Sequence, residues 1–159
     1  MCFIQIILKG SAHLQAKVAT RPIRVLKVGR KVPIKPQSLV GFESILFPIV
    51  YIPGKIYTQK PPVYNKEFHL SGKYEYERIS IEKGFHSYRN LLASITNLSI
   101  QESWEHYVYP YSIGLFEIPK GAIYYSDCGL FVSDSIKLIK VIDSAKEWIE
   151  ANFKPELIL

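Results

Sequence analysis

Turn-forming residues recur every six to eight positions between residues 112 and 141, and this spacing is the strongest constraint on the fold. Pro119-Lys120-Gly121 and Ser126-Asp127-Cys128-Gly129 each separate short runs of apolar and aromatic residues. Gly and Pro supply the backbone dihedrals that tight turns need, and short apolar runs between such turns are typical of strands. The pattern therefore predicts a small antiparallel meander.

Further segments have the composition of strands. In the segment at residues 23–28, Val25 would lie on one face and Leu26 on the other, which is typical of a central strand because side chains alternate across a sheet. We expect one sheet of at least five mostly antiparallel strands. The additional strand segments are residues 2–8, 23–28, 45–52 and 74–81.

Two segments have helical periodicity. After Ser87, apolar residues recur three to four positions apart, and the Ser87 hydroxyl is placed to cap the first turn. A second amphipathic segment begins at about Asp143 and closes the chain. We predict an α+β domain in which the sheet packs against these two helices. The residues expected to be buried are Leu91, Leu92, Ile95, Trp148, Ile149, Val25, Ile118 and Leu138.

The size of the chain, 159 residues with 48% hydrophobic and 21% charged side chains, is that of one domain with an adequate core. We therefore treat residues 1–159 as a single domain. No apolar run reaches the about 20 residues that a membrane helix needs. The apolar residues 2–8 have no preceding cation and are followed at once by Lys9, unlike a signal peptide. We expect a cytoplasmic protein with no membrane partner.

The cysteines and histidines indicate neither a disulfide framework nor a metal site. Cys2 and Cys128 are far apart in sequence, and neither belongs to a closely spaced pair of the zinc-binding kind. We expect both thiols to be unpaired, with no bound metal and no cofactor. The four histidines are scattered along the chain at His13, His69, His86 and His106.

Positive charge is concentrated in the first quarter of the chain. Residues 1–42 carry eight cations and no acid, whereas residues 43–159 carry twelve cations and fourteen acids. A field of this kind raises the local concentration of anions such as nucleotides, nucleic acids or acidic proteins. It is equally typical of a solvated segment that keeps a protein soluble. The eight cations are Lys9, Lys17, Arg21, Arg24, Lys27, Arg30, Lys31 and Lys35.

The segment from Gly84 to Arg89 is the most informative candidate site. It reads Gly-Phe-His-Ser-Tyr-Arg, so a flexible glycine precedes hydrogen-bonding side chains where a strand is expected to become a helix. The free N–H groups at a helix N-terminus favour anions, and an arginine adds a bidentate contact to phosphate. The alternative interpretation is a Ser-capped helix with a structural histidine.

Tyrosine is abundant, with 11 residues of 159, and Tyr124 and Tyr125 are adjacent. Tyrosine rings beside cations suit stacking on bases, although tyrosines also cover the rim of many small sheets. We predict a ligand-binding pocket where the 84–89 segment meets the strand of Lys27 and the Tyr124 hairpin. The predicted ligand-binding residues are Arg24, Lys27, His86, Ser87, Tyr88, Arg89, Tyr124 and Tyr125.

Several sequence blocks resemble a family of small uncharacterised proteins from tailed phages and gut Bacteroidetes. The blocks are MCFI, RVLKV, FPIVYIPGKIY, GFHSYRNLLAS, FEIPKGAIYYSD and VSDSIKLIKV, and they cover most of residues 1–141. The resemblance implies a phage protein acting in the cytoplasm of a bacterial host cell. It implies no activity.

A fainter resemblance is to the ADP-ribosyltransferase fold. It implies that Lys27 stands where that fold has an Arg, that Ser87-Tyr88 match its Ser-rich turn, and that Ser133-Asp134 lie where its catalytic Glu belongs. A Lys lacks the bidentate fork of Arg, and an Asp is one methylene shorter than Glu. These departures favour a binder without catalytic residues over a working transferase.

Four functions follow from these features. The leading one is a phage-encoded, non-enzymatic protein that binds a small anionic, nucleotide-like ligand and sequesters a host defence signal. The alternatives are a divergent ADP-ribosyltransferase-like enzyme using NAD, a structural or protein-interaction role as a virion component or an inhibitor of a host protein, and direct nucleic-acid binding. Formation of an oligomer stays open. No phosphate-binding glycine loop, zinc helix or nucleophile elbow occurs, so we predict no catalytic residues.

Overall fold

A computed structural model describes most of the chain, in nine stretches between residues 3 and 142. Every element that it assigns there is a β-strand. The described stretches are residues 3–8, 15–35, 39–44, 49–63, 65–71, 74–81, 83–89, 112–127 and 129–142. The strands are β1 (Phe3–Leu8), β2 (Lys17–Val18), β3 (Ile23–Ile34), β4 (Leu39–Ser44), β5 (Val50–Tyr51), β6 (Ile56–Thr58), β7 (Asn65–Ser71), β8 (Tyr74–Ile81), β9 (Phe85–Tyr88), β10 (Ser112–Ile118), β11 (Ile123–Asp127), β12 (Leu130–Ser133) and β13 (Ser135–Ile142).

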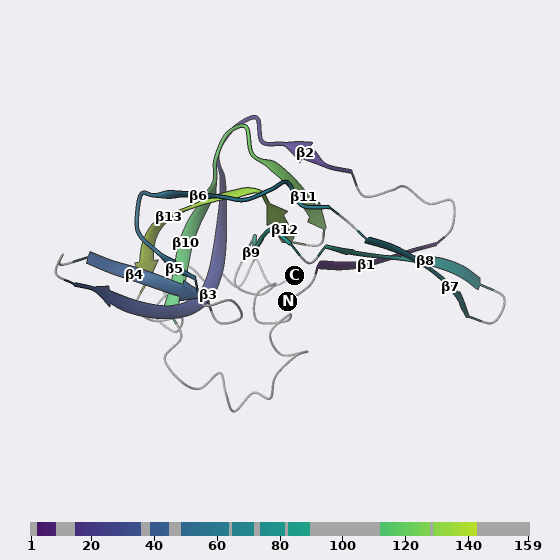
Figure 1. The fold of residues 1–159 in the computed structure, drawn as a ribbon, viewed down its shortest axis with the longest axis horizontal. Coiled ribbons are helices and arrows are strands. Elements are labelled where there is room, and N and C mark those ends of the chain that lie inside the picture. Colours follow the sequence, from purple (N-terminus) through teal and green to yellow (C-terminus); the bar gives the residue numbers. More distant parts are fainter. Residues whose placement is uncertain are drawn as a thin grey trace, which may run out of the picture.

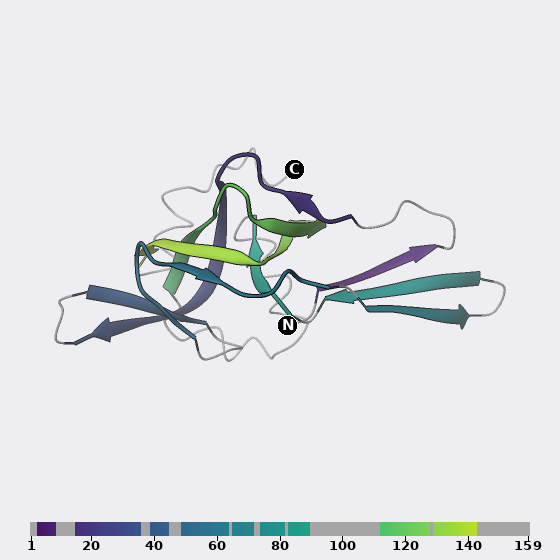
Figure 2. The ribbon, with the colours of Figure 1, turned by 45° about the horizontal axis from the view of Figure 1, so that its top comes forward.

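The described strands form two antiparallel sheets. The larger has ten strands, eight of them in the order β2-β11-β12-β9-β3-β10-β13-β6, with β4 paired to the second half of β3 and β5 paired to β4. The smaller sheet has the order β1-β8-β7 and extends to one side of the larger sheet (Figures 1 and 2). The prediction of a sheet of at least five mostly antiparallel strands is confirmed, but the expectation of one single sheet is wrong, because β1, β8 and β7 form a second sheet.

The predicted meander is wrong in its strand order, although its strands are present. β11 and β12 are neighbours, but β10 lies between β3 and β13 and is not paired with β11. Gly121 has a φ of 89°, and its N–H donates to the Ala19 carbonyl at 2.7 Å. The turn after β10 is therefore tied to the segment that follows β2, and β11 continues beside β2 rather than folding back on β10.

The first predicted helix, residues 88–98, lies outside the described residues except for residues 88 and 89, and the second, from about Asp143, lies outside them entirely. Leu91, Leu92, Ile95, Trp148 and Ile149 are likewise not described. The predicted start of the first helix is wrong. Ser87 and Tyr88 belong to β9, where Ser87 pairs with Phe131 of β12. Tyrosine favours the pleated backbone, and neighbours on both sides of β9 use its hydrogen-bonding groups. No helix of the described part is long and apolar enough to cross a membrane. Cys2 and Cys128 are likewise not described.

The large sheet curls around a core on one of its faces. Asp134 joins distant parts of the sheet, because its N–H donates to the Ile123 carbonyl at 3.0 Å and its carbonyl accepts from the Gln59 N–H at 2.9 Å. We call the face that carries Val25 and Phe116 the inner face, and the opposite face the outer face. The core residues are Ala19, Val25, Phe42, Tyr51, Phe85, Phe116, Ile118, Ala122, Phe131, Ile136 and Leu138. Among them, Val25, Ile118 and Leu138 are fully buried, as predicted.

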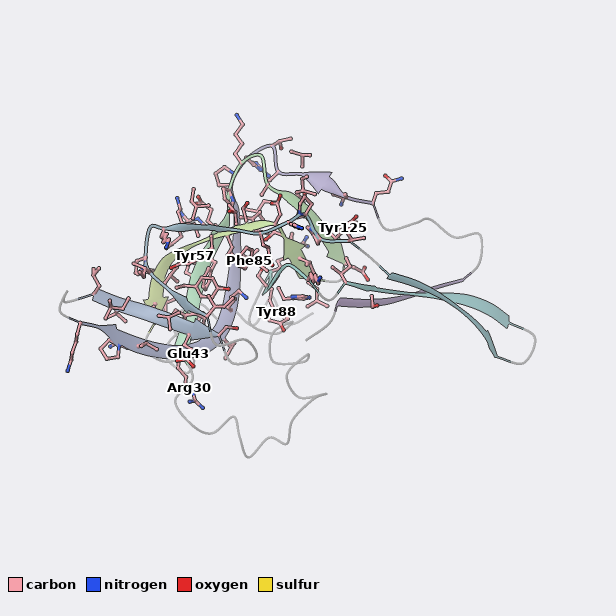
Figure 3. All side chains as sticks on the ribbon, in the orientation of Figure 1. Arg30, Glu43, Tyr57, Phe85, Tyr88 and Tyr125 are labelled. Carbon is pink, nitrogen blue, oxygen red and sulfur yellow. The ribbon has the colours of Figure 1, made fainter. Side chains whose placement is uncertain are left out.

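Aromatic rings fill the centre of this core in edge-to-face contacts. The Tyr51 ring lies 5.0 Å from Phe116 and 6.3 Å from Phe85, and the Phe42 ring lies 5.4 Å from Phe116, measured between ring centroids. Such pairs add to stability beyond the apolar area they bury. Figure 3 shows Phe85 in the interior, between the strands of the curled sheet. The aromatic core therefore joins β4, β5, β9 and β10 into one unit.

Candidate functional site

A row of cross-strand neighbours brings Lys27 and Ser87 together on the inner face. Lys27 pairs with Gly114 of β10, and on the other side of β3 the Leu26–Tyr88 pair sets the register with β9. Directly opposite residues share a face, and the next pair in this antiparallel register is Lys27 with Ser87. In the register, Lys27 therefore lies between Ser87 and Gly114, and the Phe116 and Phe42 rings occupy the space that a side chain at Gly114 would take.

The Lys27 ammonium is buried among aromatic rings. The residue is only 7% exposed, and its Nζ lies 5.7 Å from the Tyr51 centroid and 6.0 Å from the Phe116 centroid. Among the described residues, no carboxylate lies within ion-pair distance of it. Burial lowers the pKa of Lys27 from 10.5 to about 8. The described groups nearest to the ammonium are thus ring faces, which only partly offset its loss of water.

The Ser87 hydroxyl is also buried without a partner. Ser87 is fully buried, and its Oγ makes no hydrogen bond to the described residues. A buried hydroxyl without a partner costs on the order of 1 to 3 kcal/mol, so such groups are uncommon and call for an explanation. Lys27 and Ser87, two buried polar residues that the described contacts satisfy poorly, are therefore cross-strand neighbours on the inner face of β3 and β9.

Arg89 and Tyr124 each lie against the Phe131 ring on this inner face. Arg89 is exposed, and its guanidinium carbon lies 5.8 Å from the Phe131 centroid. The half-buried Tyr124 has its ring centroid 5.9 Å from that of Phe131. Ser87 pairs with Phe131 across β9 and β12, so these residues adjoin the Lys27 row. We call Lys27, Ser87, Arg89, Tyr124 and Phe131 the inner-face cluster.

The other four predicted site residues lie on the outer face. In the strand register, Arg24 and Tyr88 share the face of Leu26, while His86 and Tyr125 share the face of Val132. Figure 3 shows Tyr88 and Tyr125 on neighbouring parts of the sheet. Arg24 contacts Glu117 at 3.5 Å, and Lys137 contacts the same carboxylate at 3.3 Å. The structure thus divides the predicted site between the two faces of the sheet.

His86 stabilises a turn. Its Nδ1 lies 3.1 Å from the Gly84 carbonyl, and its Nε2 lies 3.1 Å from the Ile81 carbonyl. Burial is the main cause that lowers the pKa of His86 to about 4, and the charge of Lys27 adds to it, while the two carbonyls oppose the shift. The imidazole is therefore neutral at pH 7, and its contacts connect the end of β8 to the start of β9.

Ser133 and Asp134, which the ADP-ribosyltransferase resemblance places at the position of the catalytic Glu, make hydrogen bonds that stabilise the local backbone. The Ser133 hydroxyl donates to the Ser135 carbonyl at 2.9 Å. The Asp134 carboxylate accepts from the Ile123 N–H at 3.0 Å. Both groups stabilise the link between β12 and β13, and Glu117 lies on the outer face with Arg24 and Lys137.

Three residues of the site were not foreseen: Phe131, Gly114 and Tyr51. Each was visible in the sequence only as a strand or loop residue of a common type. Their roles arise from pairing between strands distant in sequence, since β3 and β10 are separated by more than seventy residues. The spacing of tyrosines and cations along the sequence does not predict which residues become neighbours through such pairing.

Comparisons with protein-family models, with curated proteins and with solved structures gave no match for this chain. The described part of the chain is an antiparallel β structure in which a buried lysine and a buried serine without a described partner are cross-strand neighbours.

Proposed function

We propose that the protein binds a small, phosphate-bearing, nucleotide-like anion at the inner-face cluster and does not act as an enzyme. The observation that carries the proposal is the buried Lys27 ammonium, which has no described carboxylate near it and whose cross-strand neighbour Ser87 has a buried hydroxyl without a described partner. An anion placed between them would supply the missing counter-charge and a hydrogen-bond acceptor.

The neighbouring residues fit the two parts of such a ligand. Arg89 is exposed at the end of β9, where its guanidinium can contact a phosphate that Lys27 also attracts. The Phe131 and Tyr124 rings provide an aromatic surface for a base, with their ring planes tilted by 39°. The ligand that we propose is a host signalling nucleotide, which the protein would sequester.

Thermal stability in the presence of small anions tests this function. Because a ligand that binds only the folded state raises the melting temperature, ADP and inorganic phosphate are expected to raise Tm at fixed ionic strength, and adenosine much less. Binding is expected to weaken above pH 8, where Lys27 loses its proton. Unchanged Tm with all three compounds would contradict the proposal.

Arg89→Ala is expected to reduce the affinity for ADP by about 1.5 to 3 kcal/mol, the usual range for a hydrogen bond to a charged group. The free energy of unfolding should change little because Arg89 is exposed. Isothermal titration at one salt concentration measures the first effect, and urea unfolding measures the second. The matched control is Arg30→Ala, because Arg30 extends away from the core beside Glu43 (Figure 3). Equal loss of affinity in both variants would indicate a diffuse charge effect instead of a site.

A further inference from the structure

Exposed apolar side chains are concentrated on one part of the large sheet. Seven large apolar side chains are exposed among the described residues, and four of them lie on β4, on β5 or directly before β5. These four are Leu39, Val40, Ile49 and Val50. β4 and residues 30–34 of β3 form a hairpin that extends away from the curled body of the sheet (Figures 1 and 2). We call this hairpin, together with β5, the β3–β4 arm. Apolar side chains that are exposed next to one another mark interaction surfaces.

The outer face of the arm is apolar over most of its length. Even-numbered residues of β3 lie on the outer face, and the register places Val32 opposite Gly41 and Ile34 opposite Leu39. A Cβ at Gly41 would lie 2.7 Å from Cδ1 of Ile34, so the isoleucine side chain lies across the glycine. Val50 of β5 belongs to the same face. Leu39 and Val50 are 43% and 41% exposed, so this apolar strip is open to solvent.

One cation and one carboxylate lie at the base of the strip. Arg30 and Glu43 are opposite each other in the register, on the same outer face (Figure 3). Neither forms an ion pair with another described residue. The outer face of the arm is therefore neutral, although residues 1–42 carry eight cations and no acid. A polyanion such as nucleic acid would gain little from a neutral face, whereas adjacent opposite charges are complementary to a second copy of the same face.

Both edges of the arm are protected against the addition of a further strand. On the β5 edge, the Tyr57 hydroxyl accepts from the Ile52 N–H at 2.9 Å and donates to the Val50 carbonyl at 3.4 Å. It thus occupies backbone groups that an added strand would need. On the β3 edge, Lys31 and Pro33 are residues typical of edges that resist pairing. A partner is therefore expected to contact the outer face of the arm and not to extend the sheet.

We infer that two copies of this chain associate face to face through the outer faces of their β3–β4 arms. A two-fold axis parallel to the strands places β3 of one copy against β4 of the other. Arg30 then lies opposite Glu43 of the partner subunit, and Ile34 lies opposite Leu39 of the partner subunit. The inference goes beyond the proposed function and does not depend on it, because the inner-face cluster lies on the opposite face of the sheet.

Sedimentation equilibrium of the full chain tests the association between about 5 and 500 µM, a range suited to reversible dimers with interfaces of modest area. We expect a dimer whose population rises with concentration. Leu39→Asp and Val50→Asp should each raise its dissociation constant at least about tenfold, because each puts a carboxylate into the apolar contact. Both side chains are exposed, so urea unfolding should show a folded protein in each case. The matched control is Val18→Asp, at an exposed valine of β2 outside the arm, which should leave the dimer unchanged.

Exchange of the two charges tests the arrangement of the copies. Arg30→Glu alone and Glu43→Arg alone should each prevent self-association, because like charges then meet across the two-fold axis. An equimolar mixture of these two variants should form a heterodimer, since every contact between copies again joins a cation to a carboxylate. Contacts within one chain are the same in the mixture as in the separate variants, so recovery can come only from contacts between copies.

Three results would overturn the inference. The first is a chain that stays monomeric over the whole concentration range. The second is a dimer that Leu39→Asp and Val50→Asp weaken no more than Val18→Asp does. The third is a mixture of Arg30→Glu and Glu43→Arg that remains monomeric. Binding of the monomer to a short oligonucleotide or to anionic lipid vesicles, lost in Leu39→Asp, would assign the arm to that partner in place of a second copy.

Discussion

Replacing Lys27 by Met should raise the free energy of unfolding at pH 7 by on the order of 3 kcal/mol. Its pKa falls from 10.5 in the unfolded chain to about 8 in the folded protein, and each pKa unit corresponds to about 1.4 kcal/mol. Methionine is similar in length, is apolar and has no charge to desolvate. The gain should be accompanied by loss of ADP binding.

The pH dependence of this effect has a definite sign. Between pH 8 and 10.5 the unfolded chain holds a proton on Lys27 that the folded protein does not, so the stability of the natural protein rises with pH in that window. The advantage of Lys27→Met is therefore complete below pH 8 and disappears as the pH approaches 10.5. Urea unfolding of both proteins across this range measures it.

The control for Lys27→Met is Lys140→Met, which removes an exposed lysine of β13 and should change stability by less than about 0.5 kcal/mol. A Lys27→Met variant less stable than the natural protein would show that the ammonium is satisfied in the fold, and the argument for a bound anion would fail. A buried lysine that lowers the stability of the folded protein is expected to be kept when it is needed for function.

Gly29→Ala is expected to lower the free energy of unfolding by about 2 to 4 kcal/mol. A Cβ at Gly29 would lie 2.2 Å from the Glu43 carbonyl oxygen and 2.5 Å from Cζ of the buried Phe42 ring. The carbonyl belongs to the β3–β4 pairing and cannot move without breaking that ladder. Phe42 is fully buried and packs edge-to-face on Phe116, so it has no space to move into either.

Gly54→Ala is the matched comparison for Gly29→Ala, because the reason for glycine is different there. Gly54 has a φ of 83°, and a Cβ there would have no atom within 4 Å. The left-handed backbone alone should cost about 1 to 2 kcal/mol. Urea unfolding of the two variants measures both effects, and a larger loss for Gly54→Ala than for Gly29→Ala would contradict the packing argument.

Only part of the candidate site was predicted, because adjacent residues of a strand lie on opposite faces of the sheet. Ser87 and Tyr88 were both expected to bind ligand, as were Tyr124 and Tyr125, yet adjacent residues of a strand point to opposite faces. The expectation of a helix after Ser87 concealed this, since one turn of a helix can present neighbouring side chains to a common ligand. Once Ser87 is in β9, the N-terminus of a helix is not available there as an anion site.

The sequence by itself located the strands at residues 3–8, 23–28, 74–81 and 112–118, because alternation, β-branched residues and turn signals act within a few positions of one another. It did not locate β9, where it predicted the start of a helix. It also indicated Lys27, Ser87, Arg89 and Tyr124 as polar or aromatic residues of interest. Only the tertiary structure decided that β10 lies between β3 and β13, that the sheet curls, and that Gly114 and Ser87 lie on either side of Lys27. Pairing between distant strands depends on how whole faces pack, and burial of a charge depends on every strand around it, so neither can be inferred from the residues near Lys27 in the chain.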